Sequence, residues 1–124
     1  MESTPNPAPG FVKHPGHTIT TEPLDGKVTV RANGTVLATS KAALLLYEGN
    51  YPPVIYIPFS DIDFSKLEKT GSSTYCPFKG DASYWNIRET AQSDAMWAYE
   101  HPFDEMLQIT NHGAFYPNKV EIEI

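Results

Sequence analysis

The segment 74–85 carries the residues whose types and spacing are best suited to chemistry. It contains Cys76, the one cysteine of the chain, and Lys79 follows three residues later across a Pro-Phe turn. A thiol reacts as its thiolate, which a nearby ammonium group or free backbone amides stabilise. Gly80 permits unusual backbone angles, so amides next to it could converge on a bound anion. This spacing predicts a nucleophilic Cys76 with Lys79 as its charge partner.

A nucleophilic thiol also needs an acid/base group, and two histidines are candidates for that role. These are His112, which we take as the predicted base, and His101. The sequence does not give the distance of either ring from Cys76. The alternative interpretation is that Cys76 packs as a small hydrophobic residue, as buried free cysteines do. Both interpretations stay open at this point.

Aromatic residues of the C-terminal half indicate a second kind of site. Most of them are expected to fill the core. Alternation along 82–88 places aromatic rings on both faces of one strand, however, so one face can line a cleft that stacks on a planar or cationic ligand. The predicted ligand-binding residues are Tyr51, Tyr75, Gly80, Tyr84, Arg88 and Trp97.

Motifs for metals and phosphates are weak. Asp61 and Asp63 form a D-x-D pair of the kind that holds Mg²⁺, but without a Gly-rich phosphate loop a solvated turn is the preferred interpretation. His14 and His17 flank a Pro-Gly pair and are interpreted as surface histidines. A single cysteine excludes an internal disulfide and a zinc site with several thiolates. No metal and no cofactor is therefore predicted.

The elements that must position these residues are short strands. Eleven prolines and eight glycines in 124 residues favour many turns and few long helices. Asn33-Gly34 predicts a type I′ hairpin between strands at 27–32 and 35–39. The apolar run 42–47 predicts a strand that is buried on both faces.

Further along, alternation predicts a strand at 64–69, and the polar segment 70–73 predicts a flexible connection. Single helical turns are expected at 60–63 and 103–107. The whole pattern amounts to about nine short strands with one or two helical turns, which is typical of a single all-β domain, a compact sandwich or half-barrel. We expect this domain to span 11–124, after a disordered or extended tail at 1–10.

The bulk charge and hydropathy narrow the list of partners. The net charge is −6, and Arg31 and Arg88 are the only arginines, which disfavours nucleic acid. No apolar run approaches the ~20 residues of a membrane span. The polar, proline-rich start lacks the features of a secretory signal, so a cytoplasmic location is expected. The remaining partner is a small molecule of unknown identity, and the sequence does not indicate an oligomeric state.

Four motifs, in this order, resemble the family catalogued as domain of unknown function 427. They are Gly-Asn-Tyr-Pro-Pro-Val-Ile-Tyr-Ile-Pro at 49–58, Thr-Tyr-Cys-Pro-Phe-Lys-Gly-Asp-Ala-Ser-Tyr-Trp at 74–85, Ala-Met-Trp-Ala-Tyr at 95–99 and His-Gly-Ala-Phe-Tyr-Pro at 112–117. The resemblance covers nearly the whole chain after residue 10. The motif positions that it carries over are Tyr51, Tyr75, Cys76, Lys79, Gly80, Tyr84, Trp97 and His112.

The resemblance implies a β-tent fold, with two antiparallel sheets set at an angle. Methionine sulfoxide reductase B and the ligand-binding domain of cereblon are similar folds, and many β-tent proteins hold zinc with four cysteines. Cys76 alone cannot form that zinc site. A nucleotidyltransferase label sometimes given to the family would depend here on the pair Asp61 and Asp63.

Three functions follow, in order of preference. The first is a binding module whose aromatic cleft around Cys76 and Lys79 holds a small molecule. The second is a cofactor-free enzyme, transferase- or hydrolase-like, that uses Cys76 as its nucleophile. The third is a β scaffold that docks a partner protein through a sheet edge.

Overall fold

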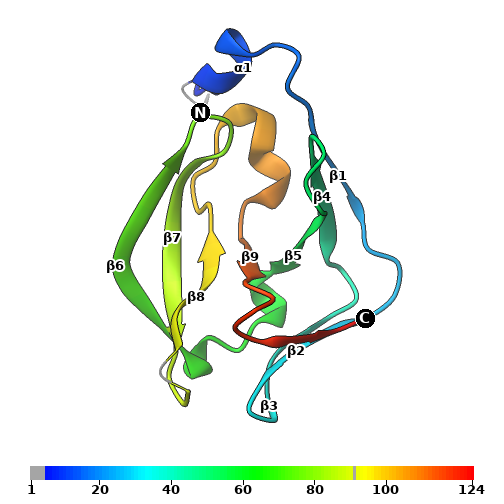
Figure 1. The fold of residues 1–124 in the computed structure, drawn as a ribbon, viewed down its shortest axis with the longest axis vertical. Helices are drawn as coiled ribbons and strands as arrows, with labels where there is room; N and C mark the ends of the chain where they lie inside the picture. Colours follow the sequence, from blue (N-terminus) through cyan, green and yellow to red (C-terminus); the bar gives the residue numbers. More distant parts are fainter. Residues whose placement is uncertain (1–4, 91) are drawn as a thin grey trace.

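The computed structural model describes residues 5–90 and 92–124, and this part of the chain forms ten strands in two antiparallel sheets (Figure 1). The strands are β1 (Ile19–Pro23), β2 (Val28–Ala32), β3 (Thr35–Ser40), β4 (Leu44–Glu48), β5 (Val54–Pro58), β6 (Leu67–Cys76), β7 (Gly80–Ile87), β8 (Gln92–Ala98), β9 (His112–Phe115) and β10 (Glu121–Glu123). The helical elements are α1 (Pro9–Lys13) and three 3₁₀ turns, η1 (Phe59–Asp61), η2 (Phe64–Lys66) and η3 (Asp104–Ile109). The predicted all-β class with two antiparallel sheets is confirmed.

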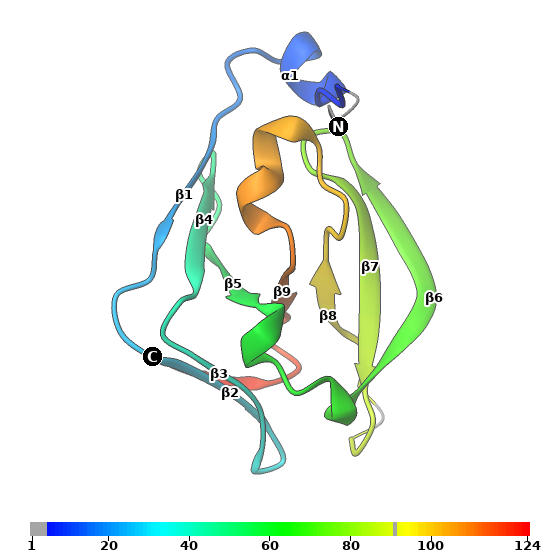
Figure 2. The same ribbon diagram turned by 180° about the vertical axis from the view of Figure 1, so that it is seen from behind.

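The larger sheet has seven strands in the order β1-β4-β5-β9-β8-β7-β6, and the smaller has three in the order β10-β2-β3. The larger sheet curves so that its edge strands β1 and β6 stand on opposite sides of the molecule (Figures 1 and 2). The small sheet lies across the lower end in these views, and α1 lies above the upper end. The 3₁₀ turn η3 is near the upper end, between the two sides of the large sheet.

The β2–β3 hairpin forms as its turn residues predict. Asn33 and Gly34 both have positive φ angles, 49° and 80°, and Ala32 pairs with Thr35. Positive φ at both central positions gives the turn that matches the twist of paired strands. Glycine adopts such angles without a steric penalty. The predicted type I′ hairpin is confirmed.

Two clusters of buried residues fill the inside. The first, which we call the apolar core, lies between the small sheet and the lower part of the large sheet. Its larger members are Val28, Val30, Leu37, Ile57, Trp85, Ile87, Met96 and Phe115. The second, which we call the upper cluster, contains Leu46, Tyr56, Ala82, Tyr99, Met106, Ile109 and Ala114, with Tyr84, Trp97 and Cys76 partly buried against it. Hydroxyl and indole groups are therefore concentrated at one end of the molecule.

Three predicted elements differ from those observed. Residues 64–66 form the 3₁₀ turn η2, whose start is capped by the Asp63 carboxylate, so the strand predicted at 64–69 begins only at Leu67. Residues 70–73 are part of β6 and not a flexible connection, because the carboxylate of Asp94 accepts hydrogen bonds from the hydroxyls of Thr70 and Ser72. Strand β4 is not buried on both faces, since Tyr47 points outward and is partly exposed. Residues on the outer face of a sheet keep contact with solvent unless another layer covers them.

The segment before β1 packs on the domain instead of standing apart from it. Ala8 is fully buried, and its backbone amide donates to the Glu105 carboxylate. The amide of Gly10 donates to the carbonyl of Pro77, and the Phe78 ring lies so close that a Cβ at position 10 would meet it at 2.7 Å. Of the expected tail, residues 1–4 lie outside the described residues, and residues 5–8 run extended into α1. No helix in the described ranges is long and apolar enough to span a membrane.

Candidate functional site

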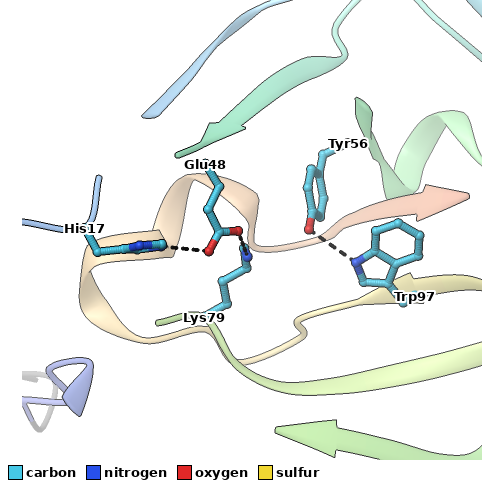
Figure 3. Close-up of polar contacts among 5 residues, drawn as sticks. All are labelled: His17, Glu48, Tyr56, Lys79 and Trp97. Atoms are coloured by element: carbon cyan, nitrogen blue, oxygen red, sulfur yellow. Dashed lines mark hydrogen bonds and ion pairs between the residues drawn. The ribbon is translucent and has the colours of Figure 1, made fainter. Parts of the chain in front are cut away.

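A buried ion pair joins two segments that are distant in the sequence. Glu48 is the last residue of β4, and Lys79 lies in the turn between β6 and β7. The Lys79 Nζ donates to Glu48 Oε1 at 2.6 Å, and only 7% of the Lys79 surface is exposed. Figure 3 shows the two side chains pointing toward each other. Removing either partner would leave a poorly solvated charge behind, which is the main way such pairs affect stability.

The second oxygen of the same carboxylate binds a histidine. His17 Nε2 lies 2.8 Å from Glu48 Oε2 (Figure 3). The His17 ring also stacks on Phe78, with 4.0 Å between the ring centroids. His14 is exposed, as expected, whereas His17 is only partly so, with 26% of its side chain accessible. The edge of the His17 ring binds the Glu48 carboxylate, and its face stacks on Phe78. Glu48 is thus held from both sides, by the segment before β1 and by the β6–β7 turn.

These two hydrogen bonds determine the charge of Glu48. Burial raises the pKa of this carboxyl group, but the hydrogen bonds and charges of Lys79 and His17 outweigh the burial and leave its pKa below the usual value of 4.5. Glu48 is therefore a carboxylate at neutral pH. The negative charge is matched by the Lys79 ammonium group beside it.

A cavity of about 200 Å³ opens beside this ion pair. Its walls are mainly aromatic, with Glu48 and Lys79 at one side and Leu46, Pro52 and Val54 completing the apolar part. The aromatic lining residues are Tyr51, Tyr56, Tyr84, Trp97, Tyr99 and Tyr116. Tyr51 is 74% exposed, so it lies at the mouth, whereas Tyr56 and Tyr99 are buried. Concave, mostly aromatic sites with a few polar groups are the usual form of small-molecule pockets.

Three tyrosines of the cavity, Tyr56, Tyr99 and Tyr116, have raised pKa values and keep their hydroxyl protons at neutral pH. Burial raises the pKa of Tyr56 and, with help from its neighbours, that of Tyr99. Burial together with a hydrogen bond to Tyr84 raises the pKa of Tyr116 to about 12. The Trp97 indole Nε1–H donates to the Tyr56 hydroxyl oxygen at 3.3 Å (Figure 3). The Tyr56 proton is therefore directed to a partner other than Trp97.

Strand register places these side chains on one face. Tyr84 of β7 pairs with Trp97 of β8, and Trp97 pairs with Ala114 of β9. Residues two apart along a strand share a face, which puts Leu46 with Glu48 on the cavity side of β4. The cavity thus draws on β4, β5, β7 and β8 together with the turns that follow β4 and β6.

Four of the predicted site residues meet around this cavity: Tyr51, Lys79, Tyr84 and Trp97. Cys76 is half-buried and packs against the upper cluster, but it does not line the cavity. Lys79 has Glu48 as its partner, which differs from the predicted pairing with the Cys76 thiol. The catalytic roles assigned to Cys76, Lys79 and His112 remain predictions.

The other predicted residues lie elsewhere. Tyr75 is 59% exposed and contacts the edge of Phe103, and Arg88 donates to the Leu67 carbonyl near the opposite end of β7. The His112 Nδ1 lies 2.9 Å from the Thr110 carbonyl at the start of β9. Gly80 is buried next to Lys79, and its φ angle of 119° requires glycine in that turn.

The carboxylates of the D-x-D pair bind serine hydroxyls and one backbone amide. Asp61 accepts a hydrogen bond from the Ser40 hydroxyl, and Asp63 accepts from the Ser65 amide at the start of η2. Both carboxylates therefore have local partners, in line with the turn interpretation. Among residues 5–90 and 92–124, no three His, Cys, Asp or Glu side chains converge on a metal-sized site.

Sequence reasoning missed Glu48, Tyr56, Tyr99, Tyr116 and His17 as site residues. One signal was present: Glu48 is a charged residue that ends an apolar run directly before the Gly-Asn-Tyr-Pro-Pro turn. Its meaning depends on Lys79, which is 31 residues away in the sequence. Only the pairing of strands between them shows that the two charges meet.

One family model matches most of this chain. The family model described as a domain of unknown function (DUF427) matches residues 20–124. The chain belongs to the DUF427 family. The match includes every lining residue of the cavity, while His17 precedes it. The search of curated proteins gave no match for this DUF427 chain. The likeness of its fold to methionine sulfoxide reductase B and to the cereblon domain stays a prediction.

Proposed function

We propose that this DUF427 protein is a binding module that holds a small, planar molecule in the cavity between β4, β5, β7 and β8. The observation that carries the proposal is the combination of an open aromatic hollow with a buried ion pair at its side, Glu48 with Lys79. Packing alone does not explain this arrangement, because protein interiors normally leave few voids larger than a water molecule.

The size of the cavity limits the ligand. An apolar cavity of roughly 150 Å³ in another protein is large enough for benzene. A volume of about 200 Å³ therefore fits one ring with a small substituent. The rings of Trp97 and Tyr116 lie 4.4 Å apart in a tilted arrangement at the cavity wall, which provides an aromatic surface for stacking.

A thermal-shift screen with single-ring compounds tests the proposal. A ligand present at ten times its Kd stabilises the folded state by about 1.4 kcal/mol, equivalent to roughly 5 °C in Tm for a domain of this size. We expect such shifts for the wild-type protein and their loss in Val54→Trp, whose indole would fill the cavity. The matched control is Val36→Trp on β3, a partly exposed valine outside the cavity lining. Binding that survives Val54→Trp and disappears in Val36→Trp would place the ligand outside this cavity. A screen in which no compound shifts the Tm would reject the proposal.

A further inference from the structure

We infer that the cavity selects planar ligands that present an acceptor oxygen, a carbonyl or a carboxylate, and that it discriminates against amines. This inference rests on the proposed function and adds the chemical class of the ligand. It is carried by the Lys79 ammonium group and the two buried phenols Tyr56 and Tyr99 on the cavity wall, which offer hydrogens to an acceptor beside a positive charge.

The donors come from three side chains. An ammonium group has three N–H bonds, and Glu48 is the one hydrogen-bond partner of the Lys79 Nζ in the described ranges, so two N–H bonds remain. The Tyr56 oxygen already accepts from Trp97, which leaves its own proton to donate. The Tyr99 hydroxyl has no hydrogen-bond partner among residues 5–90 and 92–124. These donors border one cavity, and burial keeps both phenols protonated.

The main acceptor is already engaged. Each oxygen of the Glu48 carboxylate binds a nitrogen, Lys79 Nζ at 2.6 Å and His17 Nε2 at 2.8 Å. A ligand amine would therefore compete with Lys79 and His17 for this carboxylate. A ligand with an acceptor oxygen, in contrast, meets N–H and O–H groups that have no acceptor of their own in the described part of the chain.

An aromatic site lined by a carboxylate would ordinarily suggest a cationic ligand. Here the chain supplies the cation itself, because the Lys79 Nζ lies 5.9 Å from the centroid of the Tyr99 ring. A second cation in the cavity would lie close to this ammonium group and be repelled by it. The same ammonium group attracts an oxygen that carries partial or full negative charge.

The test compares three probes of similar size and shape: benzoate, benzamide and benzylamine. Their affinities are measured by calorimetry up to about 10 mM, because compounds of this size bind weakly. We expect benzoate or benzamide to bind at least about tenfold more tightly than benzylamine, a difference of about one strong hydrogen bond. The ratio between benzoate and benzamide tells a charged acceptor from a neutral one.

Variants test the roles of the donors. Lys79→Met removes the internal cation and frees the Glu48 carboxylate, so the preference should shift toward benzylamine. Tyr56→Phe keeps the ring and removes one donor, so it should weaken benzoate and benzamide about tenfold and leave benzylamine within about twofold. Tyr99→Phe should act in the same direction. The two phenylalanine variants keep the inference testable even when Lys79→Met fails to fold, which far-ultraviolet circular dichroism would show.

The outcomes separate the inference from the function on which it rests. Benzylamine that binds as tightly as the two oxygen ligands overturns the inference and leaves the binding module intact. Phenylalanine variants with unchanged affinity for benzoate and benzamide also overturn it. A wild-type protein that binds none of these probes and none of the screened single-ring compounds rejects the binding module itself.

Discussion

The two ends of the interior are built from similar strands, but they bury different kinds of side chain. In the apolar core, Trp85 packs against the edges of Phe59 and Phe64, among aliphatic side chains from both sheets. In the upper cluster, Trp97 donates its indole N–H to Tyr56 and lines an open cavity. Each end thus holds one of the two tryptophans of the chain. The comparison teaches that the small sheet closes one end over a mainly aliphatic and aromatic core, while the other end keeps several tyrosine hydroxyls and an ion pair around a hollow.

This contrast predicts that the apolar core controls stability and that the upper cavity controls binding. The largest effect is expected from Ile87→Ala, since Ile87 is almost fully buried in the apolar core. Truncating such a side chain leaves a void and should lower the free energy of unfolding by about 2–5 kcal/mol. Urea denaturation measures this change. The control is Ile124→Ala, whose side chain is largely exposed and should cost less than about 0.5 kcal/mol.

Equal losses for these two variants would contradict the assignment of the apolar core. A change in ligand affinity for Ile87→Ala, measured under conditions where the variant is folded, would break the separation between the two ends.

Breaking the ion pair between Glu48 and Lys79 should cause the next largest loss of stability. Lys79→Met leaves the Glu48 carboxylate without its closest cation, and Glu48→Gln leaves the Lys79 ammonium without its carboxylate. Each should lower the free energy of unfolding by about 1–3 kcal/mol, because a poorly solvated charged group loses its partner. The double variant should cost less than the sum of the two, because no unpaired charge remains. Additive losses would show that the two charges do not interact in solution.

The pH dependence of stability tests the same carboxylate. The pKa of Glu48 is lowered in the folded state, so the folded protein resists protonation of this group more than the unfolded chain does. Its contribution is present above the unfolded pKa of about 4.5 and is lost as the pH falls through the lower folded value. The free energy of unfolding, measured by urea denaturation at a series of pH values from 7 to 3, should therefore fall more steeply for the wild type than for Glu48→Gln. Parallel curves would contradict the assigned shift.

The sequence predicts those elements of the fold that depend on contacts between neighbouring residues, and it misses those that depend on residues far apart in the chain. The β2–β3 hairpin was predictable because Asn33-Gly34 determines its turn locally. The strand through residues 70–73 was not, since its hydroxyls bind Asp94, which lies more than 20 residues away. A polar Thr-Gly-Ser-Ser segment carries no local sign of such a partner.

The site shows the same limit. Alternation indicated which residues share a face, and Tyr84 and Trp97 do meet at the cavity. The sequence does not reveal the partner of Lys79, because Cys76 is near in sequence, whereas Glu48 is brought near only by the curvature of the large sheet (Figures 1 and 2). Proximity along the chain therefore suggested a thiol site where the fold builds an ion pair.

The smallest effect is expected at the thiol. Cys76 packs beside the upper cluster without lining the cavity, so Cys76→Ser should change ligand affinity by less than about twofold and cost roughly 1 kcal/mol of stability. Calorimetry with the tightest probe measures the affinity. A tenfold loss would bring the thiol into the binding site and restore the hypothesis that Cys76 takes part in chemistry.

The most direct test of the binding site uses the two tryptophans. In ¹⁵N-labelled protein the indole N–H groups of Trp85 and Trp97 give two separate NMR signals, which Trp85→Phe assigns. Titration with a bound single-ring ligand should shift the Trp97 signal, because this indole lines the cavity, and leave the Trp85 signal of the apolar core in place. A ligand that shifts Trp85 alone, or that binds without moving Trp97, would contradict the account.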